Sequence, residues 1–433
     1  MRVKRVLPRR EILKKLGSGL AGACSAPAIL ASLGAQARLA FGVIGCGWRG
    51  SQHVRDLVRR SSDPSSGIVV AAVCDIFRPR LERAAMDSRA KAYRNYKEVL
   101  DRKDIDCVVI ATPDHWHAPM CLDALGAGKD VYCEKPWTLT AEQAKACYHE
   151  ALRTKRIVQV GSQHTEDGAY WTARDAIQAG KIGKIVWSQI SYSRNSREGE
   201  WNQEIPGLFA DAVSPENLDW DAFLGPAPKR PFSRERFLGF RKYWDYSGGI
   251  ASDLHYHKLA CLLIAVGMDF PWRVTSGGGI WVHKDQGREC PREVPDTFLT
   301  ILDMPGEHTI LLASSLANAS GLSDQVRGHR GNLTFVGGGV EIRPEATYEK
   351  EFLDEYHGEE VLRLPPRPRD EHMLNFIKCV RSRNMEDLNC GPELGYKTMV
   401  ATAMSVRCYR EQKVLFWDPA REEVTEKDPR GKA

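Results

Sequence analysis

A glycine-rich hexapeptide near residue 45 has the spacing of a phosphate-binding loop. It runs as G-x-G-x-x-G from Gly45 to Gly50, between a short apolar run and a segment of helical character. The first glycine of such a loop permits a tight turn, and the second lets backbone N–H groups approach a pyrophosphate. The third packs a helix against a strand. Glycine-rich turns are common, so the loop needs a second signal to predict dinucleotide binding.

An acidic residue supplies that signal. Asp75 ends the next apolar run, 68–73, where a carboxylate can bond both hydroxyls of the cofactor ribose and would repel a 2′-phosphate. Loop and carboxylate together predict a dinucleotide site that favours NAD, although Arg78 nearby leaves NADP open.

Asp253 and His257 form a candidate acid/base pair. They are four residues apart and follow a Gly-Gly turn, so on a helix they share one face. The carboxylate can orient or charge the imidazole, which relays a hydroxyl proton near neutral pH. For His257 alone, a hydrogen-bonded core histidine is the alternative. His255 lies between the two, but residues i and i+2 diverge on a helix, so no metal site is expected.

Apolar runs that alternate with helical segments predict the scaffold of the first domain. Continuous apolar strands separated by helices are typical of a parallel sheet covered on both faces. The expected strands are 39–44, 68–73, 107–111, 130–133 and 157–160. Residues 38–160 are therefore expected to form a doubly wound α/β domain.

The pattern changes after residue 160. Longer strand-like runs follow, together with glycine-rich turns, and they suit a mostly antiparallel sheet with one open face. The runs are 185–193, 297–303 and 309–315, and the turns are expected at 277–279 and 337–339. This α+β domain is expected to span 161–420, with a charged tail at 421–433.

Two other segments of the second domain stand out. A long connection, 218–246, is rich in proline, aromatic and arginine residues, the type of loop that tends to carry function. Met373, Phe376, Ile377 and Val380 fall at i, i+3, i+4 and i+7, which predicts an amphipathic helix.

The excess positive charge of the chain is confined to its first residues. Residues 1–37 carry a net charge of +6 and the whole chain carries +5. The remainder therefore has a net charge of −1, which is close to neutral, and it has no basic footprint for nucleic acid. Arg9-Arg10, a weakly apolar run 16–33 and Ala35-Gln36-Ala37 resemble a twin-arginine export signal. The protein is therefore expected in the periplasm; the alternative is a retained basic helix on a cytoplasmic protein.

Composition excludes several other classes of protein. No segment is long and apolar enough to be a convincing permanent membrane span. Twelve cysteines are scattered singly without a CxxC pair, which indicates neither a zinc site nor a disulfide framework.

Further motifs resemble the Gfo/Idh/MocA oxidoreductases, typified by glucose–fructose oxidoreductase and inositol dehydrogenase. E-K-P begins at Glu134, A-T-P-D-H-W-H runs from Ala111 to His117, and G-G-x-x-x-D-x-x-x-H ends at His257. The stretch from Leu218 to Pro228 is similar to one in many exported members. The resemblance extends from residue 38 to about 418 and rests on the combination, because no motif is specific alone.

The resemblance implies a Rossmann domain, an open-faced sheet domain and a nicotinamide in the cleft between them. Lys135 would reach the substrate oxygen beside the hydride-bearing carbon, and a lysine in a desolvated cleft can exchange protons. His257 would share the hydroxyl proton, with Asp253 in support. The predicted catalytic residues are thus Lys135, Asp253 and His257.

The motifs and the resemblance together define the expected binding residues. Those for the cofactor are Gly45, Gly47, Trp48, Arg49, Gly50, Asp75, Thr112, Pro113, His115, His117, Glu134 and Lys135. The substrate candidates are Gln163, Tyr192, Trp244, Tyr246 and His255, and core packing is the alternative for the three aromatic residues. His255 stands where the family usually has a small residue, and it could contact substrate, change the acid/base assignment or narrow the pocket.

The expected reaction is reversible hydride transfer between nicotinamide and a sugar or cyclitol hydroxyl. One alternative is an NAD-dependent glycoside hydrolase that works by transient oxidation and elimination. A second is a non-catalytic, NAD-binding regulator, which the presence of Lys135, Asp253 and His257 disfavours. Since an exposed apolar sheet face is unfavourable in water, a homodimer or homotetramer is expected.

Overall fold

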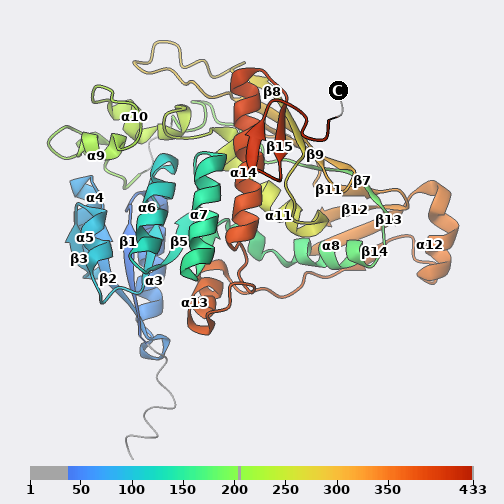
Figure 1. Cartoon of the computed structure of the whole chain (residues 1–433), viewed down its shortest axis with the longest axis horizontal. Helices are drawn as coiled ribbons and strands as arrows, with labels where there is room; N and C mark the ends of the chain where they lie inside the picture. Colours follow the sequence, from blue (N-terminus) through green and yellow to red (C-terminus); the bar gives the residue numbers. More distant parts are fainter. Residues whose placement is uncertain (1–37, 203–205, 432–433) are drawn as a thin grey trace, which may run out of the picture.

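The computed structural model describes residues 38–202 and 206–431. The predicted export signal, residues 1–37, lies outside the described residues. Two sheets dominate the molecule and lie side by side, with the N-terminal domain at one end and the large sheet at the other (Figure 1). In the part of the chain that is described, no helix is long and apolar enough to cross a membrane.

The first sheet has six parallel strands in the order β3-β2-β1-β4-β5-β6, which confirms the doubly wound fold. Its strands are β1 (Leu39–Ile44), β2 (Ile68–Cys74), β3 (Lys91–Tyr93), β4 (Cys107–Ile110), β5 (Asp130–Glu134) and β6 (Val158–Gly161). The short edge strand β3 was not predicted, because a three-residue strand with an exposed lysine offers no apolar run.

Helices cover both faces of this sheet. One face packs against α5 (Tyr96–Asp101), α6 (Asp114–Gly126) and α7 (Ala141–Thr154). The other packs against α3 (Trp48–Ser61), α4 (Arg78–Ser88) and α13 (His372–Ser382). The helix α4 ends at Ser88, because Arg89 takes a left-handed conformation with φ +57°.

The predicted helix around Phe376 exists as α13, but it packs on the first domain. Phe376 meets Phe41 of β1 with ring centroids 6.4 Å apart, and Arg383 after the helix pairs with Asp130 at 2.6 Å. The first domain is therefore completed by a segment from the far end of the chain. A division at residue 160 does not separate the two cores.

The second sheet has ten strands in the order β14-β13-β12-β11-β7-β10-β9-β8-β15-β16. Neighbours are antiparallel except β7 and β10, so the expectation of a mostly antiparallel sheet is confirmed. The strands are β7 (Ile185–Ile190), β8 (Arg273–Gly279), β9 (Thr297–Met304), β10 (His308–Ser315), β11 (Gln325–Gly328), β12 (Gly331–Val336), β13 (Gly339–Pro344), β14 (Leu362–Leu364), β15 (Leu415–Asp418) and β16 (Glu423–Thr425).

One of the two predicted glycine turns is wrong. Residues 337–339 do connect β12 to β13, with Gly338 at φ +98°. Gly277–Gly279, however, is the end of β8 and pairs with β9. A Cβ on Gly278 would lie 2.0 Å from the carbonyl oxygen of Thr297, so glycine here permits a close approach of two backbones.

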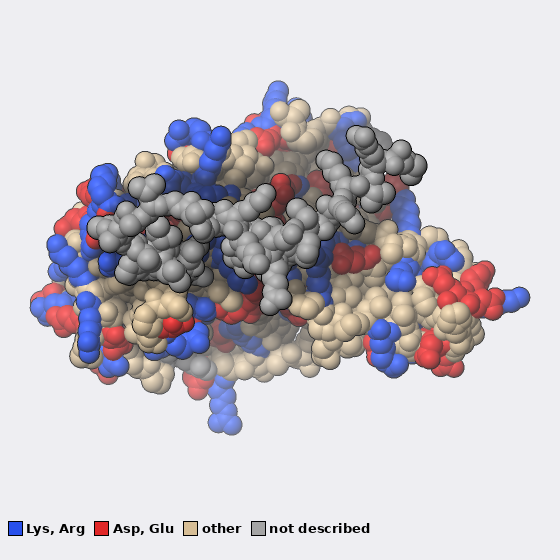
Figure 2. Space-filling model, turned by 90° about the horizontal axis from the view of Figure 1, so that it is seen from below, with Lys and Arg blue, Asp and Glu red and all other residues tan. Residues whose placement is uncertain are grey.

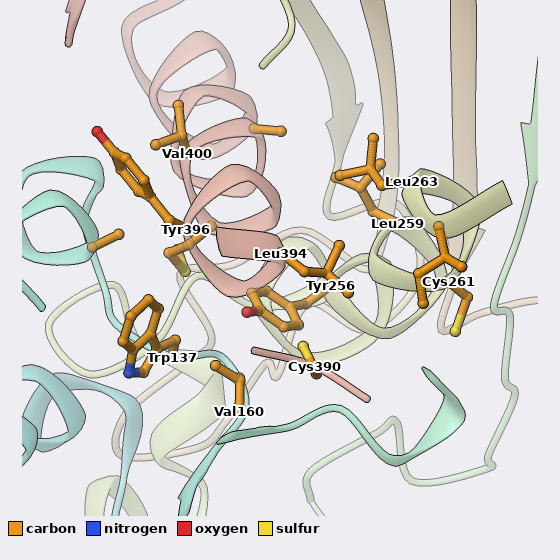
Figure 3. Close-up of a cluster of buried hydrophobic side chains, with 14 of the residues drawn as sticks. Trp137, Val160, Tyr256, Leu259, Cys261, Leu263, Cys390, Leu394, Tyr396 and Val400 are labelled. Atoms are coloured by element: carbon orange, nitrogen blue, oxygen red, sulfur yellow. The ribbon is translucent and has the colours of Figure 1, made fainter. Parts of the chain in front are cut away.

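Three helices cover the inner face of the second sheet and join it to the first domain. They are α8 (Gly168–Gln178), α11 (Tyr256–Val266) and α14 (Pro392–Glu411). Figure 3 shows Trp137 and Val160 of the first domain in one buried cluster with Tyr256 of α11 and Leu394 of α14. Because the two domains share this core, the side chains at their junction are held in fixed positions.

Acidic and basic residues are interspersed on the surface. In the space-filling view, blue and red residues alternate over the described part of the face (Figure 2). This distribution agrees with the near-neutral charge calculated for the body of the chain.

Candidate active site

A cleft of about 670 Å³ lies where the carboxyl ends of β1, β2, β4 and β5 meet the second domain. Ligands bind at this edge of doubly wound sheets, and the volume is in the range of cofactor sites. Two groups of residues line it: the nucleotide end, around Gly45 and Asp75, and the catalytic end, around Lys135 and Asp253.

The glycine loop forms the floor of the nucleotide end. Gly45 has φ +86°, and a Cβ there would lie 2.7 Å from the carbonyl oxygen of Ala111. A Cβ on Gly50 would lie 1.7 Å from the Gly45 carbonyl oxygen. At Gly47 the nearest atom is the Nη1 of Arg80 at 3.6 Å, so space remains above the loop. The N-terminus of α3 has no side-chain cap, which leaves its amides available to an anion.

Asp75 is held in place by backbone donors. Its Oδ2 accepts from Cys46 N at 2.7 Å and its Oδ1 from Phe77 N at 2.8 Å. Burial raises the pKa of this carboxyl, while Arg80 and the N–H donors act in the opposite direction. Each oxygen retains a lone pair for a ribose hydroxyl.

The arginine beside Asp75 is not the one expected from sequence. Arg78 is exposed and bonds to Asn217, whereas Arg80 lines the cleft. The Arg80 guanidinium lies between the rings of Phe77 and Phe237, 5.3 and 4.9 Å from their centroids.

These residues fit a dinucleotide. A loop with glycine at its three close-approach positions, uncapped helix amides and a fixed carboxylate are the groups that a pyrophosphate and a ribose diol require. Trp48, Arg49, Thr112 and Pro113, which are predicted cofactor contacts, also line this part of the cleft. Among the described residues, no cluster of side chains could hold a metal ion.

The catalytic end centres on an ion pair between Lys135 and Asp253. Lys135 Nζ donates to Asp253 Oδ1 at 2.6 Å and to the Asp253 carbonyl oxygen at 2.9 Å. Arg241 Nε donates to the same Oδ1 at 3.0 Å. Burial alone would raise the pKa of Asp253, but Lys135 and Arg241 outweigh it and hold the pKa well below its usual range. Asp253 is therefore an anion that orients Lys135.

His257 lies in the same cleft as an uncharged base. Its Nδ1 is 3.4 Å from Ser162 Oγ, and its ring stacks on that of His164 with centroids 4.7 Å apart. Burial, Lys135 and His164 lower the pKa of His257 well below its ordinary value. The structure thus brings the three predicted catalytic residues together: Lys135 follows β5, Asp253 lies in a π-helix, Ala251–His255, and His257 is the second residue of α11.

Glu134 organises the wall beside Lys135. Its Oε1 binds Arg49 Nε at 2.8 Å, His53 Nε2 at 2.6 Å and Gln163 Nε2 at 3.0 Å. Burial opposes ionisation, but His53 and Arg49 outweigh it and lower the pKa of Glu134. Gln163, a predicted substrate contact, therefore reaches the cleft with its amide already oriented.

The first turn of α6, which follows β4, presents different side chains from those predicted. Asp114 and Trp116 line the cleft, whereas His115 and His117 are buried beside it. His115 Nε2 lies 2.8 Å from the Phe223 carbonyl oxygen, and His117 contacts the carbonyl oxygens of Pro136 and Thr112. Both histidines hold the backbone around the site.

The remaining substrate candidates separate into two groups. Tyr192 lines the cleft. Tyr246 is fully buried against His115 and Phe223, and Trp244 packs near Tyr409; neither lines the cleft. His255 points into the core against Phe298, and burial lowers its pKa to about 3.

The connection 218–246 packs over the nucleotide end of the cleft. Phe77 forms a β-bridge with Leu218, and Asp219 N donates to the Ile76 carbonyl oxygen at 3.2 Å. Its helices are α9 (Trp220–Leu224) and α10 (Arg234–Leu238). Gly225 (φ +48°) lies so close to Trp116 that a Cβ would be 2.0 Å from the indole. Function was expected in this segment, and it contributes Ala222, Phe223, Phe237 and Leu238 to the cleft wall.

Several cleft residues were not found from the sequence. They are Arg80, His164, Arg194, Glu200, Trp201 and Arg241. Arg241 falls within the arginine-rich connection that was expected to be functional. The others have no motif, and only the fold brings them to the cleft.

Two family models match the chain. The oxidoreductase family, NAD-binding Rossmann fold (Gfo/Idh/MocA), matches residues 39–162, and the oxidoreductase family, C-terminal alpha/beta domain, matches residues 185–275. Together they cover about half of the chain.

Sequence relatives are similar over part of their length. Inositol 2-dehydrogenase of Salmonella paratyphi B is 36% identical over 150 residues, which cover 34% of this chain and 43% of the relative. The scyllo-inositol 2-dehydrogenase (NAD(+)) of Bacillus subtilis strain 168 is 33% identical over 171 residues, 39% of this chain and 49% of the relative. The match thus spans less than half of these relatives.

Solved structures share the fold over most of the chain. Levoglucosan dehydrogenase in complex with NADH is 18% identical with a TM-score of 0.64, over 87% of this chain and 98% of that one. An NAD binding oxidoreductase from Klebsiella pneumoniae is 21% identical with a TM-score of 0.63, over 88% and 99%. These two structures show the fold. The two family models, together with the glycine loop, the E-K-P lysine and the aspartate–histidine pair in one cleft, show that the chain belongs to the Gfo/Idh/MocA oxidoreductase family.

Proposed function

We propose that the protein oxidises or reduces a CH–OH group of a sugar or cyclitol with NAD as hydride carrier. The observation that carries this proposal is the presence of Lys135, Asp253 and His257 in the same cleft as the dinucleotide loop. Bound NAD supplies the hydride acceptor, and the protein must then orient a hydroxyl and take its proton.

Lys135 is the residue that orients the hydroxyl. Its ammonium has three N–H donors, and Asp253 accepts two of them. The third is left for the substrate oxygen, in a direction fixed by the other two. A positive charge beside that oxygen favours the alkoxide that develops as the hydride leaves.

His257 is the group that takes the proton. Because its pKa is lowered, the ring is neutral at neutral pH and can accept. Ser162 occupies the Nδ1 side, which leaves Nε2 for the substrate hydroxyl. In the reverse direction the same imidazolium returns the proton to the carbonyl oxygen.

The relatives support the substrate class without fixing it. The inositol dehydrogenases are named for a cyclitol and match over less than half of their length. Aromatic side chains at the catalytic end, Tyr192 and Trp201, offer flat faces on which a sugar ring can pack.

The open sheet face supports a homodimer or homotetramer. On β9, Phe298, Thr300 and Leu302 point into the core, whereas Leu299 and Ile301 are 42% and 44% exposed. A second copy of the sheet would remove this apolar surface from water. Export through the twin-arginine pathway is a proposal that rests on the sequence of residues 1–37.

The test begins with full-length protein purified without added cofactor. Released nucleotide is identified by mass spectrometry, and NADH formation is then measured with inositols and aldoses. We expect NAD binding and NADH formation with at least one polyol. Sugar release from glycosides without net NADH would instead favour the redox-assisted hydrolase, and protein that binds no dinucleotide would overturn the proposal.

A further inference from the structure

Arg241 is a cleft arginine with unused hydrogen-bond donors. Its Nε is bound to Asp253, and its guanidinium carbon lies 4.5 Å from the centroid of the Phe240 ring, which restrains the plane of the group. Within 38–202 and 206–431, neither of its terminal nitrogens has a hydrogen-bond or ion-pair partner. The side chain is 35% exposed and lines the cleft, so a fixed edge of N–H donors is available to a ligand.

The other arginine of the catalytic end is already paired. Arg194 Nη1 binds Glu200 at 2.9 Å, and its Nη2 donates to the Tyr192 hydroxyl at 2.9 Å. Lys135 gives two of its three donors to Asp253. Of the cations at the catalytic end, Arg241 therefore has the free donor pair.

The charges at this end do not balance. Among the described residues that line this end, the three anions are Asp253, Glu200 and Glu134, and the four cations are Lys135, Arg194, Arg241 and Arg49. His257 and His164 are held neutral by burial and neighbouring cations, which lower the pKa of both. One positive charge is therefore left over, the amount that a monoanionic ligand would neutralise.

The free donors lie close to the reacting centre. Lys135 Nζ and Arg241 Nε bind the same oxygen, Asp253 Oδ1, at 2.6 and 3.0 Å. A hydroxyl on Lys135 and an acid group on Arg241 are thus within the reach of a single sugar unit.

We propose that the substrate is an acidic sugar, such as a uronate or aldonate, whose carboxylate binds the terminal nitrogens of Arg241. A carboxylate fits because its two oxygens match the planar fork of a guanidinium in a bidentate pair. This inference rests on the dehydrogenase function proposed above and narrows its substrate from polyols in general to those that carry an acid group.

The test compares acidic sugars with their neutral counterparts. The probes are D-glucuronate with D-glucose, D-galacturonate with D-galactose, and D-gluconate with D-glucitol. Their binding to full-length protein saturated with NAD⁺ is measured by calorimetry, and NADH formation is measured separately. We expect at least one acid to bind about tenfold or more tighter than its neutral partner, as a charge-assisted bidentate pair implies.

Three variants assign the preference to Arg241. Arg241→Met keeps the apolar stem and should abolish the preference for the acid, while Arg241→Lys keeps the charge and should retain part of it. Arg153→Met removes an exposed arginine that pairs with Glu150 on α7, outside the cleft, and should leave the preference unchanged. The ratio of acid to neutral affinity is the readout, because a general loss of structure would affect both sugars.

The outcomes distinguish failure of the acidic-sugar inference from failure of the proposed dehydrogenase function. If no acid binds tighter than its neutral partner, or if Arg241→Met leaves the preference intact, the acidic-sugar inference is wrong, even where NADH forms from neutral sugars. If an acid binds tightly through Arg241 but no sugar yields NADH, the anion subsite stands and the dehydrogenase function fails. D-Glucose 6-sulfate binding more tightly than every carboxylate would overturn the carboxylate assignment.

Discussion

The two ends of the cleft are built in different ways. At the nucleotide end the binding groups are backbone amides and a carboxylate, supplied by the loop 45–50 and Asp75 within thirty-one residues of one another. At the catalytic end the groups are side chains, and Lys135, Arg194, Arg241 and Asp253 come from four separate segments. The first end needs one local conformation, whereas the second needs the whole fold.

This difference predicts how each end responds to substitution. A side chain at the catalytic end can be replaced without changing the backbone that binds the cofactor. The nucleotide end depends on main-chain geometry, and Asp75 is its one important side chain. Replacing Asp75 should therefore change which cofactor binds more than it changes the stability of the fold. Three substitutions test this separation.

Lys135→Met should have the largest effect. It removes the donor that faces the substrate oxygen and leaves Asp253 paired with Arg241. We expect kcat to fall by roughly 10²–10⁴-fold, the range for loss of a positioned acid/base group. The affinity for NAD, measured by fluorescence titration, should stay within about twofold. A parallel loss of NAD affinity would show that the two ends are not independent.

His255→Phe should have an intermediate effect, on stability and not on catalysis. His255 and His257 are two residues apart, but His255 is buried against Phe298 with no partner for either ring nitrogen among the described residues. Its pKa is lowered to about 3 by burial, against about 6.5 in an unfolded chain. Between these values the unfolded state binds more protons, so the wild-type protein loses stability as the pH falls below about 6.5.

The substitution removes that proton uptake. We compare the free energy of unfolding of His255→Phe with that of wild type. The difference should increase by about 2–3 kcal/mol in favour of the variant as the pH is lowered from about 7 to about 4.5. Denaturant unfolding at the two pH values measures this, and any constant packing cost of the phenylalanine cancels in the difference. His257→Phe serves as a contrast: it should abolish the proton acceptor of the reaction. If His255→Phe also reduces kcat more than a few-fold at neutral pH, the core position of His255 does not explain its role.

The contrast between the nucleotide end and the catalytic end also explains which features could be predicted from the sequence. The glycine loop and Asp75 are recognisable because adjacent residues produce their geometry. The parallel sheet was predicted because each strand is a continuous apolar run. Asp253 and His257 were indicated by their spacing after a Gly-Gly turn as well as by the family motif. Lys135 was found through the family motif, since spacing alone does not separate it from a surface lysine.

Other features depend on contacts that no local pattern encodes. His164 stacks on His257 from a different segment of the chain, and Arg194 reaches the cleft from the segment that follows β7. The periodicity around Phe376 predicts a helix with an apolar face, but not that this face packs on β1. Gly278 was predicted to lie in a turn. It lies in β8, where glycine is required because the backbone of β9 approaches closely.

Asp75→Asn should have the smallest effect, on the choice of cofactor. The amide keeps the size of the side chain but removes the charge that would repel a 2′-phosphate. It also places an NH₂ group against one of the two backbone donors, Cys46 N or Phe77 N, so NAD affinity should fall. We expect the ratio of NAD to NADP affinity to decrease about tenfold, measured by titration with both dinucleotides.

Arg78→Ala is the matched control, because Arg78 is exposed and bonded to Asn217, and it should change the ratio by less than about twofold. If Arg78→Ala changes the affinity ratio and Asp75→Asn does not, side chains at the surface select the cofactor. The carboxylate that the loop holds in place would then not determine the specificity of the nucleotide end.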